Sequence, residues 1–255
     1  MPTMKITFAG FLIAFIAASA DASSFIVISQ VYGGGGNSGS TLRNDFVELF
    51  NRGTPVTLTG WSIQYASANG STWDVTPLNI SLSPGQYYLI ALAAGTGGTV
   101  NLPSAQATGS TNLSATAGKI ALVNSTVPLS GTCPPAETIV DFVGYGSANC
   151  AETASAPGLT NTTALMRGSN GCADTDLNLT DFSTAAPAPR TASTPRIDCG
   201  VVTLTGSNTN LVPQGASSTP GAFAPAPLIF SPTSLRAAVT KPCSRSIIFR
   251  HYPPS

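Results

Sequence analysis

The chain has 255 residues, of which 11 are Lys or Arg, 11 are Asp or Glu, and one is His. Charged residues make up only 9% of the chain, while hydrophobic residues make up 42%. Long surface helices need more Glu, Lys and Arg than this, so the composition disfavours a helical protein. It favours short strands that are joined by polar turns.

The N-terminus has the parts of an export signal. Lys5 supplies a positive charge, residues 8–18 form an apolar run, and small residues at 18–22 suit cleavage. The apolar run is too short to span a bilayer comfortably. We predict a signal peptide over residues 1–22, with an uncleaved anchor as the alternative. The mature protein is then secreted, periplasmic or at the cell surface, without a transmembrane segment.

Short apolar segments with turn residues between them follow the predicted signal. They alternate or are rich in β-branched and aromatic residues, and no stretch shows sustained helical periodicity. The predicted strands are 25–32, 45–51, 61–66, 72–75, 86–92, 119–124, 138–145 and the short segment 164–167. About seven short strands with frequent turns predict an all-β, Ig-like β-sandwich.

The strand DFVELFN predicts which side chains face the core. Alternate side chains of a strand point to the same face, so Val47 and Leu49 are expected inside. Glu48 stands between two Phe and is costly to bury unpaired, so we expect it to face water or a partner such as Arg52. Trp61, directly after a turn glycine, is the expected core anchor.

The five cysteines contain no C-x-x-C pair, which disfavours zinc-finger and thioredoxin-like sites. Disulfides are the default for an exported protein. Among the pairings of four cysteines we favour sequence neighbours, Cys133–Cys150 and Cys172–Cys199, which leaves Cys243 over. Each bridge is expected to contribute about 3 kcal/mol in the chain-entropy model.

Charge is distributed unevenly along the chain. Residues 23–200 hold ten acids and six bases, whereas residues 201–255 hold four bases and no acid. An acidic body argues against nucleic acid as its main ligand. Residues 201–255 are rich in Ser, Pro and Gly, and we predict a linker with a disordered or truncated end. We interpret its bases as a solvated tail, with contact to nucleic acid or anionic lipid as the alternative.

The stretch YGGGGNSGS, residues 32–40, has the look of a phosphate-binding loop. Such a loop needs a helix N-terminus after it and usually a Lys at fixed spacing. Here a strand follows, and the nearest base is Arg43. We predict a flexible connection between the first two strands that offers an exposed, adaptable contact to another protein, with nucleotide binding as the alternative.

Several motifs, taken in order, resemble the lamin-tail domain family. They are NDFVELFNRG (44–53), LTGWSIQ (58–64), LSPGQYYLI (82–90), AAGTGG (93–98) and KIALVNST (119–126). SQVYGGGG, DFVGYGSANC and SNGCADTD resemble the secreted bacterial branch, which adds cysteines. The resemblance implies an Ig-like sandwich with its core over residues 25–145, in a domain over residues 23–200 that includes a disulfide-stapled, loop-rich extension.

The resemblance also implies function. The family has no known catalytic residues and no cofactor, and its roles are protein contact, DNA or envelope association, and the positioning of partners. Secreted members often accompany extracellular nucleases or other hydrolases as accessory modules. We therefore predict a secreted, non-enzymatic module that contacts a protein partner, with an accessory subunit of an extracellular nuclease or other hydrolase, acting in trans, as the alternative.

Catalytic chemistry has few candidate residues. The only histidine, His251, lies in the tail, so the body cannot assemble a Ser-His-Asp, Cys-His or histidine–metal site. A carboxylate-dependent, glycan-active enzyme is a further alternative, which needs two carboxylates that face each other across a cleft. The candidates are Asp45, Glu48, Asp74 and Asp141.

The segment DTDLNLTD resembles the start of a calcium loop, in which alternate oxygens converge on the cation. The ligands would be Asp174, Asp176, Asn178 and Asp181. Leu179 stands where such a loop has glycine, and the Glu at position twelve is absent. The other interpretation, which we favour, is a turn stabilised by its own Asp and Asn side chains.

Overall fold

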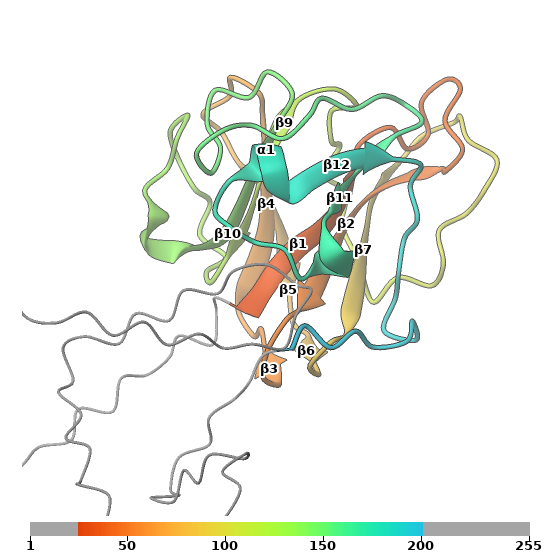
Figure 1. Cartoon of the computed structure of the whole chain (residues 1–255). Coiled ribbons are helices and arrows are strands. Elements are labelled where there is room, and N and C mark those ends of the chain that lie inside the picture. The colour runs from red at the N-terminus through yellow and green to blue at the C-terminus, as the bar shows by residue number, and fades with distance from the viewer. Residues whose placement is uncertain (1–24, 201–255) are drawn as a thin grey trace, which may run out of the picture. The chain divides into compact units, whose positions relative to one another are not determined.

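The computed structural model describes residues 25–200, so the predicted signal peptide and the predicted tail at 201–255 lie outside the described residues. Two sheets pack face to face (Figure 1). Sheet A has the order β12-β11-β1-β2-β7-β8, and sheet B has the order β10-β9-β4-β5. A short ribbon, β3-β6, lies at one end. The predicted all-β, Ig-like sandwich is confirmed.

The bounds of the elements are as follows. Sheet A contains β1 (Ile26–Tyr32), β2 (Asn44–Asn51), β7 (Tyr87–Ala94), β8 (Ala107–Thr108), β11 (Ala164–Arg167) and β12 (Phe182–Ala185). Sheet B contains β4 (Trp61–Ser67), β5 (Asp74–Leu78), β9 (Gly118–Val123) and β10 (Ile139–Tyr145). The ribbon is β3 (Val56–Thr57) and β6 (Ser81–Leu82), and the helical turns are η2 (Ala136–Thr138), η3 (Ser169–Gly171) and α1 (Asn178–Asp181).

All the predicted strands are present, with small shifts at their ends. The segment expected to stop before Pro77 continues through it, because β5 pairs only with β4 and an edge strand tolerates a residue without an N–H. The prediction missed β3, β6, β8 and β12. The first three have only two residues each, too few to show an alternation.

The main core fills the space between the sheets. Val47 and Leu49 face it from β2, as predicted, beside Ile28 of β1 and Leu122 of β9. Trp61, expected as the core anchor, packs only partly buried at the rim. The buried tryptophan is Trp73, which lies on the outer face of sheet B with its indole N–H donated to a main-chain oxygen.

The outer face of sheet A is also buried, which corrects the prediction for Glu48. Phe46, Glu48 and Phe50 all have 0% exposure, although they point away from the main core. Residues 186–199, called the strap below, lie against this face and are shown in blue in Figure 1, running from β12 along the β7 side toward β6. The strap covers Glu48 and Phe50 through Arg190 and Ile197, whereas Leu102 and Ala105 pack on the side of Phe46. All of these residues are distant in sequence from β2, so strand alternation could not show the cover.

The glycine stretch joins β1 to β2, as predicted, but it is not an exposed, adaptable loop. Gly33, Gly34, Gly35 and Gly36 are buried. A Cβ atom on Gly35 would lie 1.9 Å from the main chain of Asn44. Glycine is therefore required here because neighbouring backbone comes too close for a side chain. In this connection, residues 37–39, Thr41 and Arg43 are exposed.

Two disulfides staple the part of the domain after β9. They join Cys133 to Cys150 and Cys172 to Cys199, the pairs favoured from the sequence, with Cα–Cα distances of 5.4 and 5.5 Å. Within residues 25–200, no helix has both the length and the apolar character needed to cross a membrane.

Candidate functional site

The candidate site lies on the outer face of sheet A, around the buried carboxylate of Glu48. The pairing of β1 with β2 shifts register between Ile28 and Gln30, a β-bulge that places both Ser29 and Gln30 beside Glu48. Ser29 Oγ donates to Glu48 Oε1 at 2.5 Å, and Gln30 Nε2 lies 3.4 Å from Oε2. The bulge therefore gathers three polar side chains at one point of the sheet.

Arg190 of the strap binds this carboxylate. Its Nη2 lies 2.7 Å from Glu48 Oε1, its Nε lies 3.1 and 3.2 Å from the two oxygens, and its main-chain N–H donates to Oε2 at 2.6 Å. The guanidinium carbon lies 3.9 Å from the centre of the Tyr87 ring, and Nη1 donates to the Tyr87 hydroxyl at 2.9 Å. A planar guanidinium satisfies a carboxylate and an aromatic ring together, which a lysine ammonium does not.

The main chain of the strap is bound as well. The side-chain amide of Gln30 donates to the oxygen of Ala188 at 2.9 Å and accepts from its N–H at 2.8 Å. Farther along, the N–H of Ile197 donates to the oxygen of Gly85 at 3.1 Å. These contacts recognise an extended backbone and do not depend on the strap's side chains.

Burial and charge pairing act in opposite directions on the pKa of Glu48, and the effect of burial is the larger. Burial raises the pKa of Glu48, and the hydrogen bonds and the positive charge of Arg190 oppose that rise. The Glu48 side chain is 0% exposed and that of Arg190 is 17% exposed. Removing either partner would leave a charge poorly solvated, at a cost of about 3–5 kcal/mol for a fully buried pair.

A second ion network surrounds Arg167 of β11. Its Nη2 lies 2.9 Å from both carboxylate oxygens of Asp141, and its Nη1 lies 2.8 Å from Asp174. Asp174 also pairs with Arg52 at 2.5 Å. Arg52, expected beside Glu48, therefore serves a different carboxylate. The network ties β10 and β11 to the loop after η3.

Three carboxylates come close together in this network. Ligand atoms of Asp141, Glu152 and Asp174 all lie within 4.8 Å of one another. Burial, followed by the charge of Asp141, raises the pKa of Glu152 to about 8, so Glu152 is mostly protonated at neutral pH. Arg167 contacts two of the three carboxylates, so the protein itself supplies positive charge here.

The predicted calcium ligands point in different directions. Asp174 faces the two arginines, and Asp176 is exposed. Asn178 is buried and accepts from the main chain of β10. Asp181 accepts from the N–H and the hydroxyl of Thr175 at 2.8 Å each. These contacts are those of a turn that is stabilised by its own side chains.

The four candidate carboxylates of the glycan-active alternative have separate surroundings. Asp45 is buried beside the glycine stretch and accepts from the N–H groups of Gly35 (2.9 Å) and Leu113 (2.8 Å). Glu48 and Asp141 are bound by different arginines, and Asp74 is exposed on the edge strand β5. A glycan-active enzyme needs two carboxylates that face each other. These four carboxylates do not share a hydrogen-bond or ion-pair partner that would bring two of them together.

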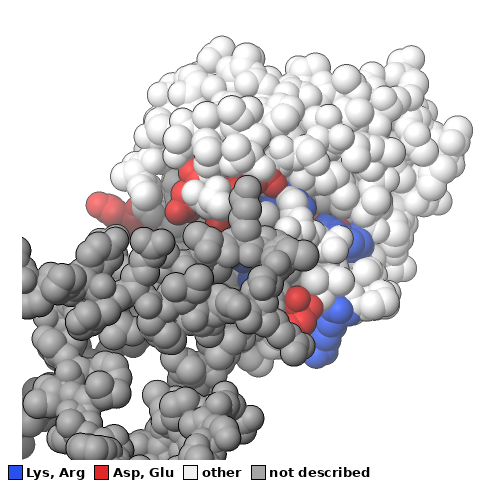
Figure 2. Space-filling view, viewed as in Figure 1, with Lys and Arg blue, Asp and Glu red and all other residues white. Residues whose placement is uncertain are grey.

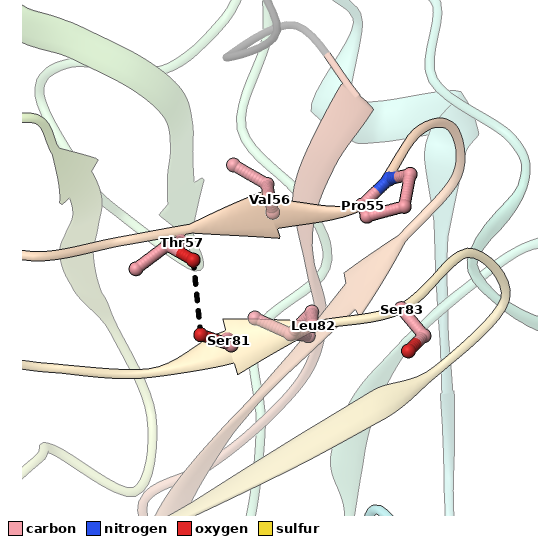
Figure 3. A pocket seen from close by; sticks show the side chains of 6 residues that line it. All are labelled: Pro55, Val56, Thr57, Ser81, Leu82 and Ser83. Atoms are coloured by element: carbon pink, nitrogen blue, oxygen red, sulfur yellow. Dashed lines mark hydrogen bonds between the residues drawn. The ribbon is translucent and has the colours of Figure 1, made fainter.

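Two open hollows mark the described surface. One, of about 210 Å³, lies at the ribbon and is lined by Pro55, Val56, Thr57, Ser81, Leu82 and Ser83 (Figure 3). The other, of about 470 Å³, lies beside β7 and β8. Neither is lined by a carboxylate, an arginine or a cysteine, so neither combines concavity with acid–base groups.

The sequence reasoning missed Arg190 and Arg167, the partners of Glu48 and Asp141. One signal was available, because residues 23–200 hold only six bases and every buried carboxylate needs a partner. An arginine isolated among small neutral residues, as in APAPRTAS, is therefore a candidate partner. No spacing rule connects position 190 with position 48.

Comparison with known proteins agrees with this architecture. The family model of the Lamin Tail Domain matches residues 19–147, just over half of the chain. It covers β1 to β10, including Ser29, Gln30, Glu48 and Tyr87, and it ends before β11, β12 and the strap. A search of curated proteins finds no match. The chain therefore belongs to the lamin-tail domain family, with its sandwich extended by two strands and a strap.

Proposed function

We propose that the chain is a secreted, non-enzymatic module that contacts a protein partner outside the cell. The way its carboxylates are used carries the proposal. Asp45, Glu48 and Asp141 are buried and bound by N–H groups or guanidinium ions, and neither hollow is lined by one. A catalytic carboxylate must reach its substrate to exchange a proton, so the arrangement supports binding over turnover.

The surface and the disulfides support the same proposal. On the face shown in Figure 2, the visible Lys, Arg, Asp and Glu side chains lie in the lower half, and the upper part of the face shows none. Depletion of charge is typical of the central part of protein interfaces. Disulfides persist in oxidising compartments, and together with the predicted signal peptide they support secretion.

The test is to express the full chain and to capture the protein that reaches the culture medium with an antibody to residues 201–255. Amine-reactive cross-linkers would report poorly on contacts of the sandwich, because Lys119 is the only lysine within residues 23–200 and it is buried. We expect the protein in the medium without residues 1–22, and one other protein captured with it at a constant ratio. A captured hydrolase would favour the accessory-subunit alternative.

Two results would contradict the proposal. One is retention of the protein inside the cell with residues 1–22 intact. The other is turnover of a glycan by the purified protein that is lost in Asp141→Asn, with the variant still folded by circular dichroism.

A further inference from the structure

We propose that the outer face of sheet A around Glu48 is a recognition site for an arginine in an extended segment of the partner protein, and that the strap fills this site in the free chain. The inference rests on the proposed function and names the surface that would serve it. In this view the strap shows, in cis, how an extended segment of a partner would be held.

The site recognises one side chain by its shape and charge. Both oxygens of Glu48 accept hydrogen bonds from Arg190, and the guanidinium carbon lies over the Tyr87 ring, 3.9 Å from its centre. Fork-shaped pairing and stacking together select arginine over lysine. A buried carboxylate with no cation would be costly, so the site favours a segment that brings one.

The site recognises the backbone beside that arginine as well. Gln30 makes a reciprocal pair of hydrogen bonds with Ala188, two residues before Arg190. The N–H of Arg190 itself donates to Glu48. An extended segment that places an arginine two residues after the residue paired with Gln30 therefore meets all of these contacts.

The strap is seated shallowly apart from these contacts. Ala186, Ala188 and Ser193 are exposed, and Thr191 is the least exposed residue of the strap, at 8%. The strap forms no strand, and the Cys172–Cys199 disulfide ties it down at one end. A competing segment needs to replace a few hydrogen bonds, one ion pair, the stacking of Arg190 on Tyr87 and the packing of Ile197 against the cluster of Val27, Phe50 and Tyr87.

The origin of the two parts agrees with this inference. Ser29, Gln30, Glu48 and Tyr87 all lie within the part of the chain that matches the family, whereas the strap lies beyond it. The recognising face thus belongs to the lamin-tail sandwich, and the covering segment belongs to the extension. Because the strap is tethered, it competes at an effective concentration in the millimolar range, which weakens binding of a partner until the strap is displaced.

The experiment uses full-length Arg190→Ala, which removes the strap's own side chain from the site. The probe is a fluorescent peptide with the sequence of residues 186–196, APAPRTASTPR, and fluorescence anisotropy is the readout. We expect Arg190→Ala to bind this peptide at least about tenfold more tightly than the wild-type chain does. The double variant Arg190→Ala, Glu48→Gln should bind the peptide about a hundredfold more weakly than Arg190→Ala does.

Two controls accompany this measurement. Arg196→Ala removes an exposed arginine of the same strap that makes no ion pair or side-chain hydrogen bond among residues 25–200, and it should behave as the wild type. A peptide with lysine at the position of Arg190 should bind about tenfold more weakly than the arginine peptide. If Arg190→Ala does not fold, the Cys172→Ser, Cys199→Ser chain, whose strap lacks its tether, should still bind the peptide more tightly than the wild type.

Several outcomes would overturn the inference. One is a folded Arg190→Ala chain, or a folded untethered chain, that binds no peptide, and another is equal binding of the arginine and lysine peptides. Wild-type dimers held by exchanged straps would place a second copy of the chain in the site instead of a partner. If Glu48→Gln still captures the partner from the medium, the proposed function stands and this site is wrong.

Discussion

Lys119 of β9 donates a hydrogen bond of 2.8 Å from Nζ to Oδ1 of Asn149. The same Nζ donates to the main-chain oxygen of Thr132 at 2.6 Å. Thr132 and Asn149 directly precede Cys133 and Cys150, which form a disulfide. One buried ammonium therefore binds the residue before each of the two cysteines. The lysine thus stabilises the loops that cover the outer face of sheet B.

Lys119→Met should therefore destabilise the domain. It leaves three oxygens, including that of Gly70, without their charged donor, and we expect a loss of about 2–3 kcal/mol in the free energy of unfolding. Urea denaturation followed by tryptophan fluorescence measures this loss. The exposed Arg43→Met is the matched control and should change the free energy by less than about 0.5 kcal/mol. Equal effects of the two substitutions would refute this role of Lys119.

Arg167→Met should be more damaging. Its side chain has 0% exposure, and its Nη2 donates to both oxygens of Asp141, which has 3% exposure. The substitution therefore leaves a buried carboxylate uncompensated. We expect a loss of about 3–5 kcal/mol. The double substitution Arg167→Met, Asp141→Leu should recover a large part of that loss, because both charges are then absent. Thermal unfolding by calorimetry compares the three chains, and a double variant no more stable than Arg167→Met would count against a buried ion pair.

Asp45 should make stability fall as the pH rises. Burial raises its pKa from 3.8 to about 7, so the folded state holds the proton more tightly than the unfolded state. The stabilising contribution of that proton is complete below pH 3.8 and is lost as the pH passes through about 7. The shift corresponds to at most about 4 kcal/mol.

The measurement for Asp45 is urea denaturation at several pH values between 5 and 8. Asp45→Asn should flatten the fall in the free energy of unfolding, whatever its absolute stability, because Asn does not titrate. Glu152, whose pKa is raised to about 8 by burial, contributes a fall of the same sign that remains in this variant. Identical slopes for the wild type and Asp45→Asn would contradict the prediction.

Two substitutions compare the glycines of the β1–β2 connection. Gly35→Ala forces a Cβ to 1.9 Å from the main chain of Asn44, so the backbone must move, and we expect a loss above about 3 kcal/mol. Gly39 has a φ of +79° but open space, so Gly39→Ala should cost only about 1 kcal/mol. Melting temperatures rank the two variants, and a milder effect at Gly35 would show that the loop can open.

Local sequence patterns predicted most of the fold. Alternation in DFVELFN placed Val47 and Leu49 in the core, and turn residues separated nearly every strand. The patterns failed where one element covers another that is distant in sequence. Glu48 contacts Arg190, which lies 142 residues away in sequence. The alternation of side chains along one strand cannot predict such a contact.

The candidate site likewise contains features that local sequence predicts and features that depend on contacts distant in sequence. Glu48 could be singled out as a charge between two aromatic residues, and the disulfide pairs could be chosen as neighbours. The bulge at Ser29 could not be predicted, because FIVISQVY reads equally well as a regular strand. The four glycines led to the prediction of an open loop. They are required instead because another part of the backbone comes close, and that contact is a tertiary property that the local sequence does not show.

The positions of Arg167 and Arg190 in the sequence determine how far this domain can be truncated from its C-terminal side. A polypeptide that stops at residue 147, where the family match ends, would keep Asp141 and Glu48 but lose the cations that neutralise them. It would also lose β11, and the edge of β1 would then be open to pairing with other chains. The residues that match the family, 19–147, are therefore fewer than the residues that this sandwich needs for folding. A chain truncated at residue 147 should aggregate.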